Sequence, residues 1–374
     1  MKVYLDNNAS TPIDPEVIKE LEPYITEYYG NPSSGHWLGK KGKEALESAR
    51  KQVADLIGAK PSEIIFTSGG SESNNHALKG VAFANREKGD HIITSVIEHP
   101  AIINPCEYLK REGFNVTYVG VDEYGRVNLD EIKNAITDKT ILISIMHANN
   151  ETGTIQPIAE ISKICKRKGV LLHTDAAQTV GKIPSDVNEL GVDLMSIAGH
   201  KFYAPKGVGV LYIREGTKLE LLIHGANHEM GKRAGTENVS GIVALGKASQ
   251  IAHEHMNEYD KEILRLRDLL HEKLKSIANV KLNGHPKERL PNTLNLSFAG
   301  IDSSQMLSKL KNIALSTGSA CHDNVKEPSA VLTAMKVPDE LALGAIRFSL
   351  GKFNTEDEIN YAVDEIKKLL GAKI

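Results

Sequence analysis

The chain has 374 residues, of which 41% are hydrophobic and 25% are charged, and its formal net charge at pH 7 is −3. This length and composition are ordinary for a globular protein with a substantial core. The small negative charge argues against general nucleic-acid or membrane-surface binding. The apolar runs fall short of the ~20 residues that are needed to cross a bilayer. We therefore expect no direct nucleic-acid partner and no membrane partner.

The N-terminus and the cysteines indicate the cellular compartment. The chain begins with Met1-Lys2-Val3-Tyr4-Leu5, without the pattern of a signal peptide. Its three cysteines, Cys106, Cys165 and Cys321, are an odd number and lack the spacing of metal ligands. We therefore expect no metal site. Both features predict a reducing compartment, the cytoplasm, where a special thiol acts as a nucleophile and not as part of a disulfide.

The N-terminal two thirds of the chain alternate between strand and helix patterns. Asp14 as an N-cap and Pro15 as the first helical residue predict a helix that runs to about Tyr29, and an amphipathic helix is predicted over Trp37–Ile57. Short apolar or β-branched runs predict strands at 3–5, 64–67, 91–94, 116–119, 141–145, 170–173, 192–197 and 208–213. A further helix is predicted near 102–112. This alternation predicts an α/β fold with a mostly parallel sheet and helices on both faces.

The pattern changes after Asn238. A long helical stretch, rich in Lys and Glu, is predicted from about Val239 to Ile277 and is expected to bridge two domains. Beyond it, an α+β pattern has strands predicted at 280–282, 293–298 and 345–349. We therefore expect a large domain of residues 13–250. The small domain is expected to combine residues 1–12 with residues 251–374.

Lys201 lies in a turn between two of the predicted strands, and Gly199 and Pro205 break the chain around it. A lysine between core strands is unusual, because burial of an unpaired ammonium is unfavourable. One interpretation is an exposed loop lysine. The other is a lysine kept for covalent chemistry, as a Schiff base with an aldehyde cofactor.

Other predicted strand ends carry residues that suit the second interpretation. Residues 68–71, Ser-Gly-Gly-Ser, precede a helix and can bind a phosphate, although such turns are often only chain punctuation. His99 follows one strand and Asp175 follows another, where an aspartate either caps a helix or pairs with a protonated ring nitrogen. Ligands of such sheets bind at the carboxyl ends of strands. Together these groups predict a pyridoxal phosphate site: a phosphate-binding turn, a carboxylate, an imidazole and a lysine.

Several motifs along the whole chain occur together with this set. They are Tyr4-Leu5-Asp6-Asn7-Asn8-Ala9-Ser10-Thr11-Pro12, Asn31-Pro32-Ser33-Ser34, Phe66-Thr67-Ser68-Gly69-Gly70-Ser71-Glu72-Ser73-Asn74, Glu98-His99, His147-Ala148-Asn149-Asn150-Glu151-Thr152-Gly153, His173-Thr174-Asp175-Ala176-Ala177-Gln178, Gly199-His200-Lys201, Arg233-Ala234-Gly235-Thr236 and Ser316-Thr317-Gly318-Ser319-Ala320-Cys321. In these motifs the sequence resembles group I cysteine desulfurases of the NifS/IscS type. These are class V aminotransferases among the fold-type I pyridoxal-phosphate enzymes. The resemblance implies a mostly parallel, seven-stranded sheet in the large domain and a smaller α+β domain.

The resemblance also implies how the cofactor, pyridoxal 5′-phosphate, is held. Lys201 forms the Schiff base, while His99 stacks on the ring and serves in acid–base steps. Asp175 pairs with the pyridinium nitrogen, and Gln178 hydrogen-bonds the ring oxygen. Gly70, Ser71 and His200 are implied to hold the phosphate. Thr236 is implied to reach the phosphate in the partner subunit, so we expect a homodimer.

The substrate side follows from the same resemblance. Asn150, which also contacts the cofactor, and Arg347 are implied to bind the substrate carboxylate, which suits the planar fork of an arginine. Cys321 lies among small and polar residues, which predicts an exposed and mobile loop. Its thiolate is implied to take sulfur from L-cysteine as a persulfide, leaving L-alanine. His322, its neighbour, is a candidate to influence the pKa of that thiol.

The implied activity is therefore a cysteine desulfurase that passes sulfur to an acceptor protein, for iron–sulfur clusters or another sulfur-containing product. Two features depart from the common pattern: Ala198 replaces a serine that contacts the phosphate, with Ser196 as a candidate substitute, and the chain ends at Ile374 without the extension that docks an iron–sulfur scaffold. The kind of acceptor thus stays open. Selenocysteine lyase and DNA-phosphorothioation desulfurase are alternatives within the same group, and an aminotransferase or a non-catalytic relative is a weaker one.

Overall fold

The computed structural model describes residues 1–277, 279–317 and 327–371. Its largest sheet has seven strands, and only β8 runs antiparallel to its neighbours. In spatial order the strands are β2 (Ile64–Thr67), β8 (Gly209–Ile213), β7 (Leu194–Ala198), β6 (Leu171–Asp175), β5 (Thr140–Ser144), β3 (His91–Ser95) and β4 (Asn115–Val119). The mostly parallel, seven-stranded sheet is confirmed.

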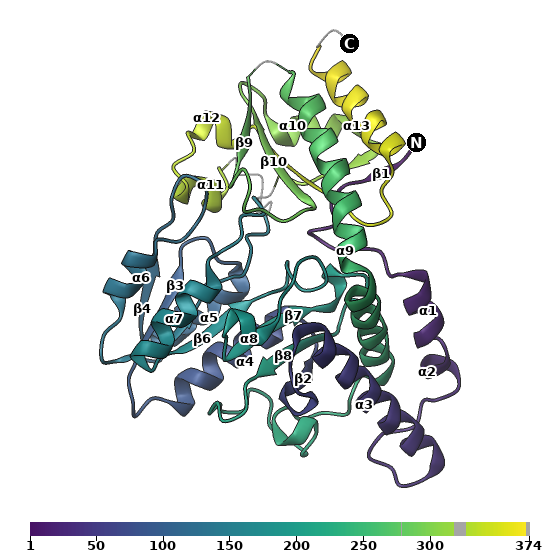
Figure 1. Ribbon diagram of the computed structural model, residues 1–374, viewed down its shortest axis with the longest axis vertical. Coiled ribbons are helices and arrows are strands. Elements are labelled where there is room, and N and C mark those ends of the chain that lie inside the picture. Colours follow the sequence, from purple (N-terminus) through teal and green to yellow (C-terminus); the bar gives the residue numbers. More distant parts are fainter. Residues whose placement is uncertain (278, 318–326, 372–374) are drawn as a thin grey trace.

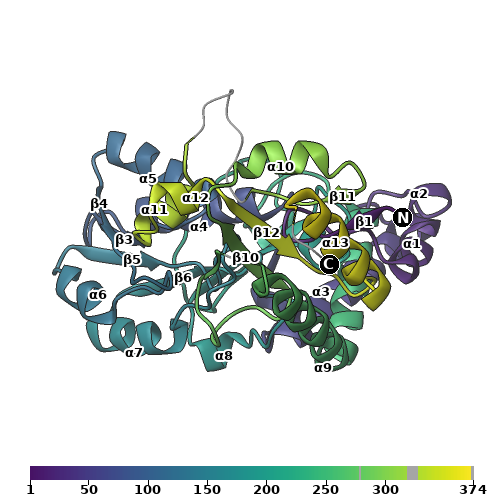
Figure 2. The same ribbon diagram turned by 90° about the horizontal axis from the view of Figure 1, so that it is seen from above.

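Helices cover both faces of this sheet, as Figure 2 shows for α4 and α5 on one side and α6 and α7 on the other. Successive side chains of a strand point to opposite faces. Ile64 and Phe66 accordingly pack with α3, while Ile65 packs with α4. Each such buried side chain contributes roughly 1.5–3 kcal/mol relative to exposure. The helices are α3 (Trp37–Ile57), α4 (Gly70–Ala84), α5 (Pro100–Arg111), α6 (Leu129–Ala135) and α7 (Ile158–Lys168).

A second, smaller part of the molecule holds an antiparallel sheet of three strands and a parallel pair (Figure 1). The three strands are β12 (Ala345–Ser349), β10 (Thr293–Phe298) and β9 (Val280–Asn283), and the pair is β1 (Val3–Tyr4) with β11 (Ile313–Ala314). The packed helices are α10 (Ser303–Lys309), α11 (Ala330–Ala334), α12 (Asp339–Ala342) and α13 (Glu356–Leu369). β1 brings the N-terminal segment into this part of the molecule.

The long helix α9 (Val239–Lys275) runs along both parts (Figure 1). Its residues Ile242 and Leu245 pack in the core of the large sheet, whereas Leu266 and Leu270 pack in the core of the small one. The predicted domain boundary at residue 250 therefore lies inside a continuous helix. The division into two domains stays a prediction, supported by the separate sheets and cores.

The helix predicted over residues 15–29 is wrong in its length. Two short helices take its place, α1 (Pro15–Leu21) and α2 (Pro23–Thr26). Pro23 has no N–H to donate to the preceding turn, and this breaks the helical ladder. The remaining short elements are η1 (Pro61–Glu63), α8 (Val187–Leu190), η2 (Gly199–Lys201) and η3 (Glu229–Gly231). Among the described residues, no helix combines the length and apolar character needed to cross a membrane.

Candidate active site

A cavity of about 250 Å³ lies where the carboxyl ends of five strands meet. Strands β2, β3, β5, β6 and β7 all end at the same edge of the large sheet, because β8 alone reverses direction. Eight residues predicted from the sequence line this cavity: Gly70, Ser71, His99, Asn150, Asp175, Gln178, His200 and Lys201. The structure therefore brings together side chains from segments that are more than 100 residues apart.

Lys201 lies in η2, the short turn that directly follows β7. Its Nζ donates hydrogen bonds to the carbonyl oxygens of Asn8, at 2.6 Å, and Ala9, at 2.9 Å. Burial and the positive charge of Arg347 lower the pKa of Lys201 to about 8, against the opposing effect of Asp175. The amine is thus held in place and is easier to deprotonate than an ordinary lysine, as a nucleophilic lysine requires.

Asp175 ends strand β6 and is only 8% exposed. Its Oδ2 accepts a hydrogen bond from Asn74 Nδ2 at 2.7 Å, and its Oδ1 accepts one from the backbone N–H of Ala177 at 3.0 Å. Asn74 also lines the cavity but was not among the predicted residues. Its position one helical turn after Gly70 is a spacing that places both on the same side of α4 and was an available signal.

His99 is the N-cap of α5, and its Nδ1 accepts a hydrogen bond from the backbone N–H of Ala101 at 3.1 Å. In the neutral ring this leaves Nε2 as the protonated nitrogen. Burial lowers the pKa of His99, and the charge of Lys201 acts in the same direction, whereas Asp175 opposes it. The neutral form of the imidazole is therefore favoured beside the lysine and the aspartate.

The N-terminus of α4, with Gly70 and Ser71, forms a corner of the cavity that suits an anion. The helix begins at Gly70 after Gly69, whose φ of 147° suits glycine, and no side chain caps its first turn. Its backbone N–H groups are therefore available to an anion, together with the hydroxyl of Ser71. Burial and three lysines lower the pKa of the nearby His200 to about 4, so its ring is neutral at physiological pH.

Ala198 lines the same corner, and a Cβ placed at Gly70 would lie 3.3 Å from the Ala198 Cβ. The hypothesis that Ser196 supplies the missing phosphate contact is wrong. The Ser196 Oγ is fully buried on β7 and pairs with His173 Nε2 at 3.0 Å, away from the cavity lining. Ser10 offers a hydroxyl closer to the corner, since its Oγ lies 3.3 Å from His200 Nδ1.

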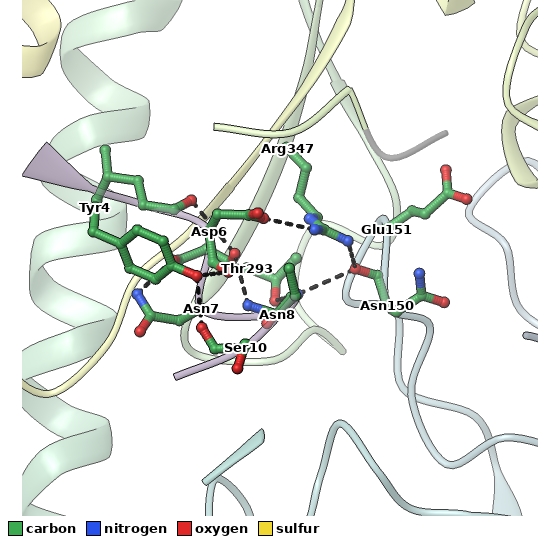
Figure 3. Close-up of polar contacts among 12 residues, drawn as sticks. Tyr4, Asp6, Asn7, Asn8, Ser10, Asn150, Glu151, Thr293 and Arg347 are labelled. Atoms are coloured by element: carbon green, nitrogen blue, oxygen red, sulfur yellow. Dashed lines mark hydrogen bonds and ion pairs between the residues drawn. The ribbon is translucent and has the colours of Figure 1, made fainter. Parts of the chain in front are cut away.

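Arg347 lies on β12, outside the cavity lining but directly beside it (Figure 3). Its Nη1 donates to the carbonyl oxygen of Asn150 at 3.0 Å, and its Nη2 forms an ion pair with Asp6 Oδ1 at 2.7 Å. The Nε of this 5% exposed side chain has no partner among the described residues. A buried guanidinium with a spare donor suits the recognition of a carboxylate.

Among the described residues, Arg347 and Thr236 are the two predicted site residues that do not line the cavity. Thr236 is exposed in the loop between η3 and α9. Cys321 and its neighbour His322 lie outside the described residues. The other two cysteines, Cys106 and Cys165, are buried and free. Among the described residues, no group of three or more His, Cys, Asp or Glu side chains could hold a metal ion.

The donor set of the cavity fits pyridoxal 5′-phosphate. The uncapped helix terminus suits a phosphate, Asp175 is a buried carboxylate for a protonated ring nitrogen, and Lys201 supplies an amine. Asn74 Oδ1 is buried without a partner among the described residues, at a wall of the same cavity. Fold and cavity thus define a pyridoxal-phosphate enzyme built on an α/β sheet.

Comparison with known proteins specifies the class further. The chain belongs to the aminotransferase class-V family, whose sequence profile matches residues 3–361. It is 53% identical to a protein named cysteine desulfurase IscS of Dictyoglomus turgidum, with 99% of this chain and 94% of the relative covered. It is 51% identical to the cysteine desulfurase IscS of Methanosarcina thermophila, with 98% and 92% covered. A solved structure titled NifS-like protein superposes with a TM-score of 0.94, at 42% identity and 99% and 100% coverage.

Proposed function

We propose that this protein is a pyridoxal-phosphate-dependent cysteine desulfurase, which converts L-cysteine into L-alanine and carries the sulfur on Cys321 as a persulfide. The observation that carries the proposal is the cavity in which Lys201, Asp175, His99 and the uncapped end of α4 converge. The full-length similarity to proteins named cysteine desulfurase supports the choice among the reactions of the family.

Lys201 is proposed as the residue that anchors the cofactor and moves the proton of the substrate Cα. When bound, pyridoxal 5′-phosphate supplies an aldehyde for amines and a ring that accepts electrons from the substrate Cα. The lowered pKa of Lys201, about 8, leaves part of the amine neutral near physiological pH and able to accept a proton at Nζ. The carbonyl oxygens of Asn8 and Ala9 hold Nζ through hydrogen bonds.

The other cavity residues are proposed to hold the cofactor. Asp175 would pair with the protonated ring nitrogen, and a hydrogen bond from Asn74 to its Oδ2 orients the carboxylate. His99 lies against the ring and takes part in proton transfer. Gln178 donates one amide hydrogen to the carbonyl oxygen of Asn8 and has a second for the ring oxygen. The phosphate is assigned to Gly70, Ser71 and His200, and Asn150 adds a contact at the far wall.

The substrate carboxylate is proposed to bind Arg347 together with Asn150. The planar guanidinium matches a carboxylate geometrically, and the charge-assisted contact orients the substrate relative to Lys201. Arg347 is already close enough to Lys201 to lower its pKa. Arg347 comes from the small sheet, and Asn150 lines the cavity and accepts a hydrogen bond from it.

Cys321 is proposed as the sulfur acceptor. Its thiolate attacks the substrate sulfur, so that an S–S bond forms and the C–S bond of the substrate breaks. The electron pair of the broken bond stays with the carbon, which takes up a proton and leaves as alanine. Neither other cysteine suits this step, because burial raises the pKa of Cys106 and of Cys165 to about 12.

The finer assignments are also proposals. Thr236 is exposed and does not line the cavity of its own chain, which supports a homodimer in which it reaches the phosphate of the partner subunit. An acceptor protein then takes the persulfide sulfur for iron–sulfur clusters or another sulfur-containing product. The free thiols of Cys106 and Cys165 support a reducing compartment, the cytoplasm.

The test is the release of alanine and sulfur from L-cysteine by the purified, cofactor-loaded protein. We expect one alanine for each sulfur, and C321A should lose sulfur release while it keeps the visible absorption of the bound cofactor. C106A is the matched control, since it removes an inert buried thiol and should keep its activity. Sulfide release by C321A at the native rate would rule out the persulfide route.

The same assay separates the alternatives. A selenocysteine lyase would turn over L-selenocysteine and leave L-cysteine almost untouched. An aminotransferase would pass an amino group to a keto acid without releasing sulfur, and C321A would not affect it. We expect L-cysteine to be turned over and to depend on Cys321.

A further inference from the structure

Asn8, in the loop between β1 and α1, has a direct contact with the reactive lysine. Its carbonyl oxygen accepts hydrogen bonds from Lys201 Nζ at 2.6 Å and from Gln178 Nε2 at 3.0 Å. The residue is only 1% exposed. Two cavity side chains from the large sheet are therefore placed by one carbonyl group of the N-terminal loop.

The side chain of Asn8 fixes the direction of that carbonyl. Its Nδ2 donates to the carbonyl oxygen of Asn150 at 3.2 Å and to Thr293 Oγ1 at 2.8 Å (Figure 3). Its Oδ1 accepts from Asn292 Nδ2 at 2.9 Å and from Lys182 Nζ at 3.4 Å. Every hydrogen-bonding atom of this side chain is thus engaged, so the amide has a single preferred orientation.

The contact at Asn150 leads on to the carboxylate end of the site. The carbonyl oxygen of Asn150 accepts from Asn8 and also from Arg347 Nη1, at 3.0 Å. The second arm of Arg347 pairs with Asp6, two residues before Asn8 in the same loop. The arginine and the lysine are therefore joined through a continuous series of hydrogen bonds in which Asn8 is the central residue.

We propose that Asn8 is a positioning residue, which holds the Lys201 amine in register with the carboxylate-binding pair Arg347 and Asn150. The roles of these two ends rest on the proposed function. The Asn8 side chain itself touches neither reacting atoms nor substrate in this assignment and acts through the backbone carbonyl of Asn8 and through its neighbours. Loss of its side chain frees the carbonyl group, so that Nζ and the guanidinium are no longer held at a fixed separation.

The neighbouring Asn7 provides a matched control. It is a buried amide in the same loop, 4% exposed, and its Nδ2 donates to the carbonyl oxygen of Ser349 at 3.0 Å. Replacement by alanine removes a buried hydrogen bond in both cases, but only N8A removes the contacts to Asn150 and Thr293. A purely structural role of the loop predicts similar effects for N7A and N8A.

The first readout does not need turnover. Full-length protein is freed of cofactor, pyridoxal 5′-phosphate is added, and the visible absorption that follows reaction with Lys201 is recorded over time. We expect N8A to form this absorption on the order of 10-fold more slowly than the native chain. N7A is expected to keep the native rate, and the unfolding midpoints of both variants report on stability. Equal rates in N8A and the native chain, or equal slowing in N7A, would overturn the proposal.

The second readout uses the loaded enzyme and L-cysteine. N8A should lower kcat and raise KM together, because Lys201 and the carboxylate-binding pair no longer keep fixed relative positions. If N8A does not fold, N8D replaces it, since the aspartate keeps the shape and the acceptor oxygen but lacks the two N–H donors. N8D should show the same slowing in the first readout, and a native rate would overturn the proposal. Failure of the native chain to desulfurate cysteine would remove the proposed function and leave the first readout intact.

Discussion

The two sides of the candidate site are built in different ways. The wall formed by the large sheet takes Asp175, Gln178 and Lys201 from residues 175–201, where two neighbouring strands end. The second side, called the assembled wall, lies beside the cavity lining and is built from distant parts of the chain, such as Asp6 and Arg347, which are 341 residues apart and form an ion pair. The first wall is set by local strand geometry, and the second depends on how the N-terminal loop meets the small sheet.

The sheet wall and the assembled wall also differ in their electrostatics. On the sheet wall, burial favours neutral groups: the pKa of His200 falls to about 4 and that of Lys201 to about 8. On the assembled wall, the buried guanidinium of Arg347 is paired with the carboxylate of Asp6. In the proposed function, the sheet wall supplies the chemistry, while the assembled wall sets the orientation of a charged substrate. Variants of each wall should therefore fail in different ways.

The largest effect is expected on the sheet wall, for K201A. Removal of the amine eliminates both the cofactor anchor and the proton acceptor, and a positioned acid–base group alone contributes about 10²- to 10⁴-fold. We expect the rate of alanine formation to fall by about 10⁴-fold and the native visible absorption to be lost. Activity with L-cysteine and the absorption spectrum measure these changes.

K206A is the control for this prediction, since Lys206 is an exposed lysine in the same turn. It should keep the native spectrum and nearly native turnover. A K201A protein that retained turnover near the native rate would show that another group moves the proton. The sheet wall would then not be the chemical side of the cavity.

A smaller effect is expected for R347Q on the assembled wall. A hydrogen bond to a charged group contributes ~1.5–3 kcal/mol, so loss of the guanidinium should lower kcat/KM for L-cysteine by about 10²-fold. The loss should appear mainly as a raised KM, because the proposed role of the arginine is to bind the substrate and not to transfer a proton. Steady-state kinetics separates the two parameters.

D6N provides a second, opposite test of the same wall. Arg347 lowers the pKa of Lys201 and Asp6 raises it, with Asp175 as the other charged neighbour. R347Q should therefore move the pH midpoint of Lys201 reactivity upward, and D6N should move it downward. The pH dependence of the reaction with pyridoxal 5′-phosphate measures both. Shifts in the same direction would contradict the view that Asp6 and Arg347 balance each other.

The sequence predicted the sheet wall well for a physical reason. In a parallel sheet the polar residues that follow buried strands meet at one edge, so Asp175 and Lys201 could be placed together from strand patterns alone. The resemblance to a known family then supplied residues such as Gln178 and His200. Asn74 was missed although its helical spacing from Gly70 is a local signal.

The assembled wall was less accessible to such reasoning. Asn8 makes its contacts with residues 142 to 341 positions away, and no periodicity of the sequence encodes such pairs. Pro23, by contrast, was a local signal that the predicted helix over 15–29 underweighted. The Ser196 hypothesis failed because this residue lies two positions before Ala198, inside β7, where its hydroxyl is fully buried and bonds with His173.

The smallest change in activity is expected for E98Q, which probes how the sheet wall is held. Glu98 is 6% exposed, and its carboxyl oxygens accept hydrogen bonds from Ser95 Oγ at 2.7 Å and from the backbone N–H of Met146 at 3.0 and 3.1 Å. It thus ties the loop that carries His99 to the end of β5. Burial raises the pKa of Glu98 from 4.5 to about 8, so the group is mostly protonated at pH 7 and glutamine is a close mimic.

The pH dependence of the free energy of unfolding tests whether Glu98 is protonated in the folded chain. Between pH 4.5 and about 8 the folded chain keeps a proton on Glu98 that the unfolded chain releases, so this group makes the protein less stable as pH rises. The free energy of unfolding of E98Q, measured by denaturant titration, should therefore lack that decline and exceed the native value above pH 8. E123Q, which alters an exposed glutamate, should run parallel to the native chain. If the free energy of unfolding of E98Q also ran parallel to that of the native chain, Glu98 would be ionised in the folded chain. The sheet wall would then depend on a buried charge, as the assembled wall does.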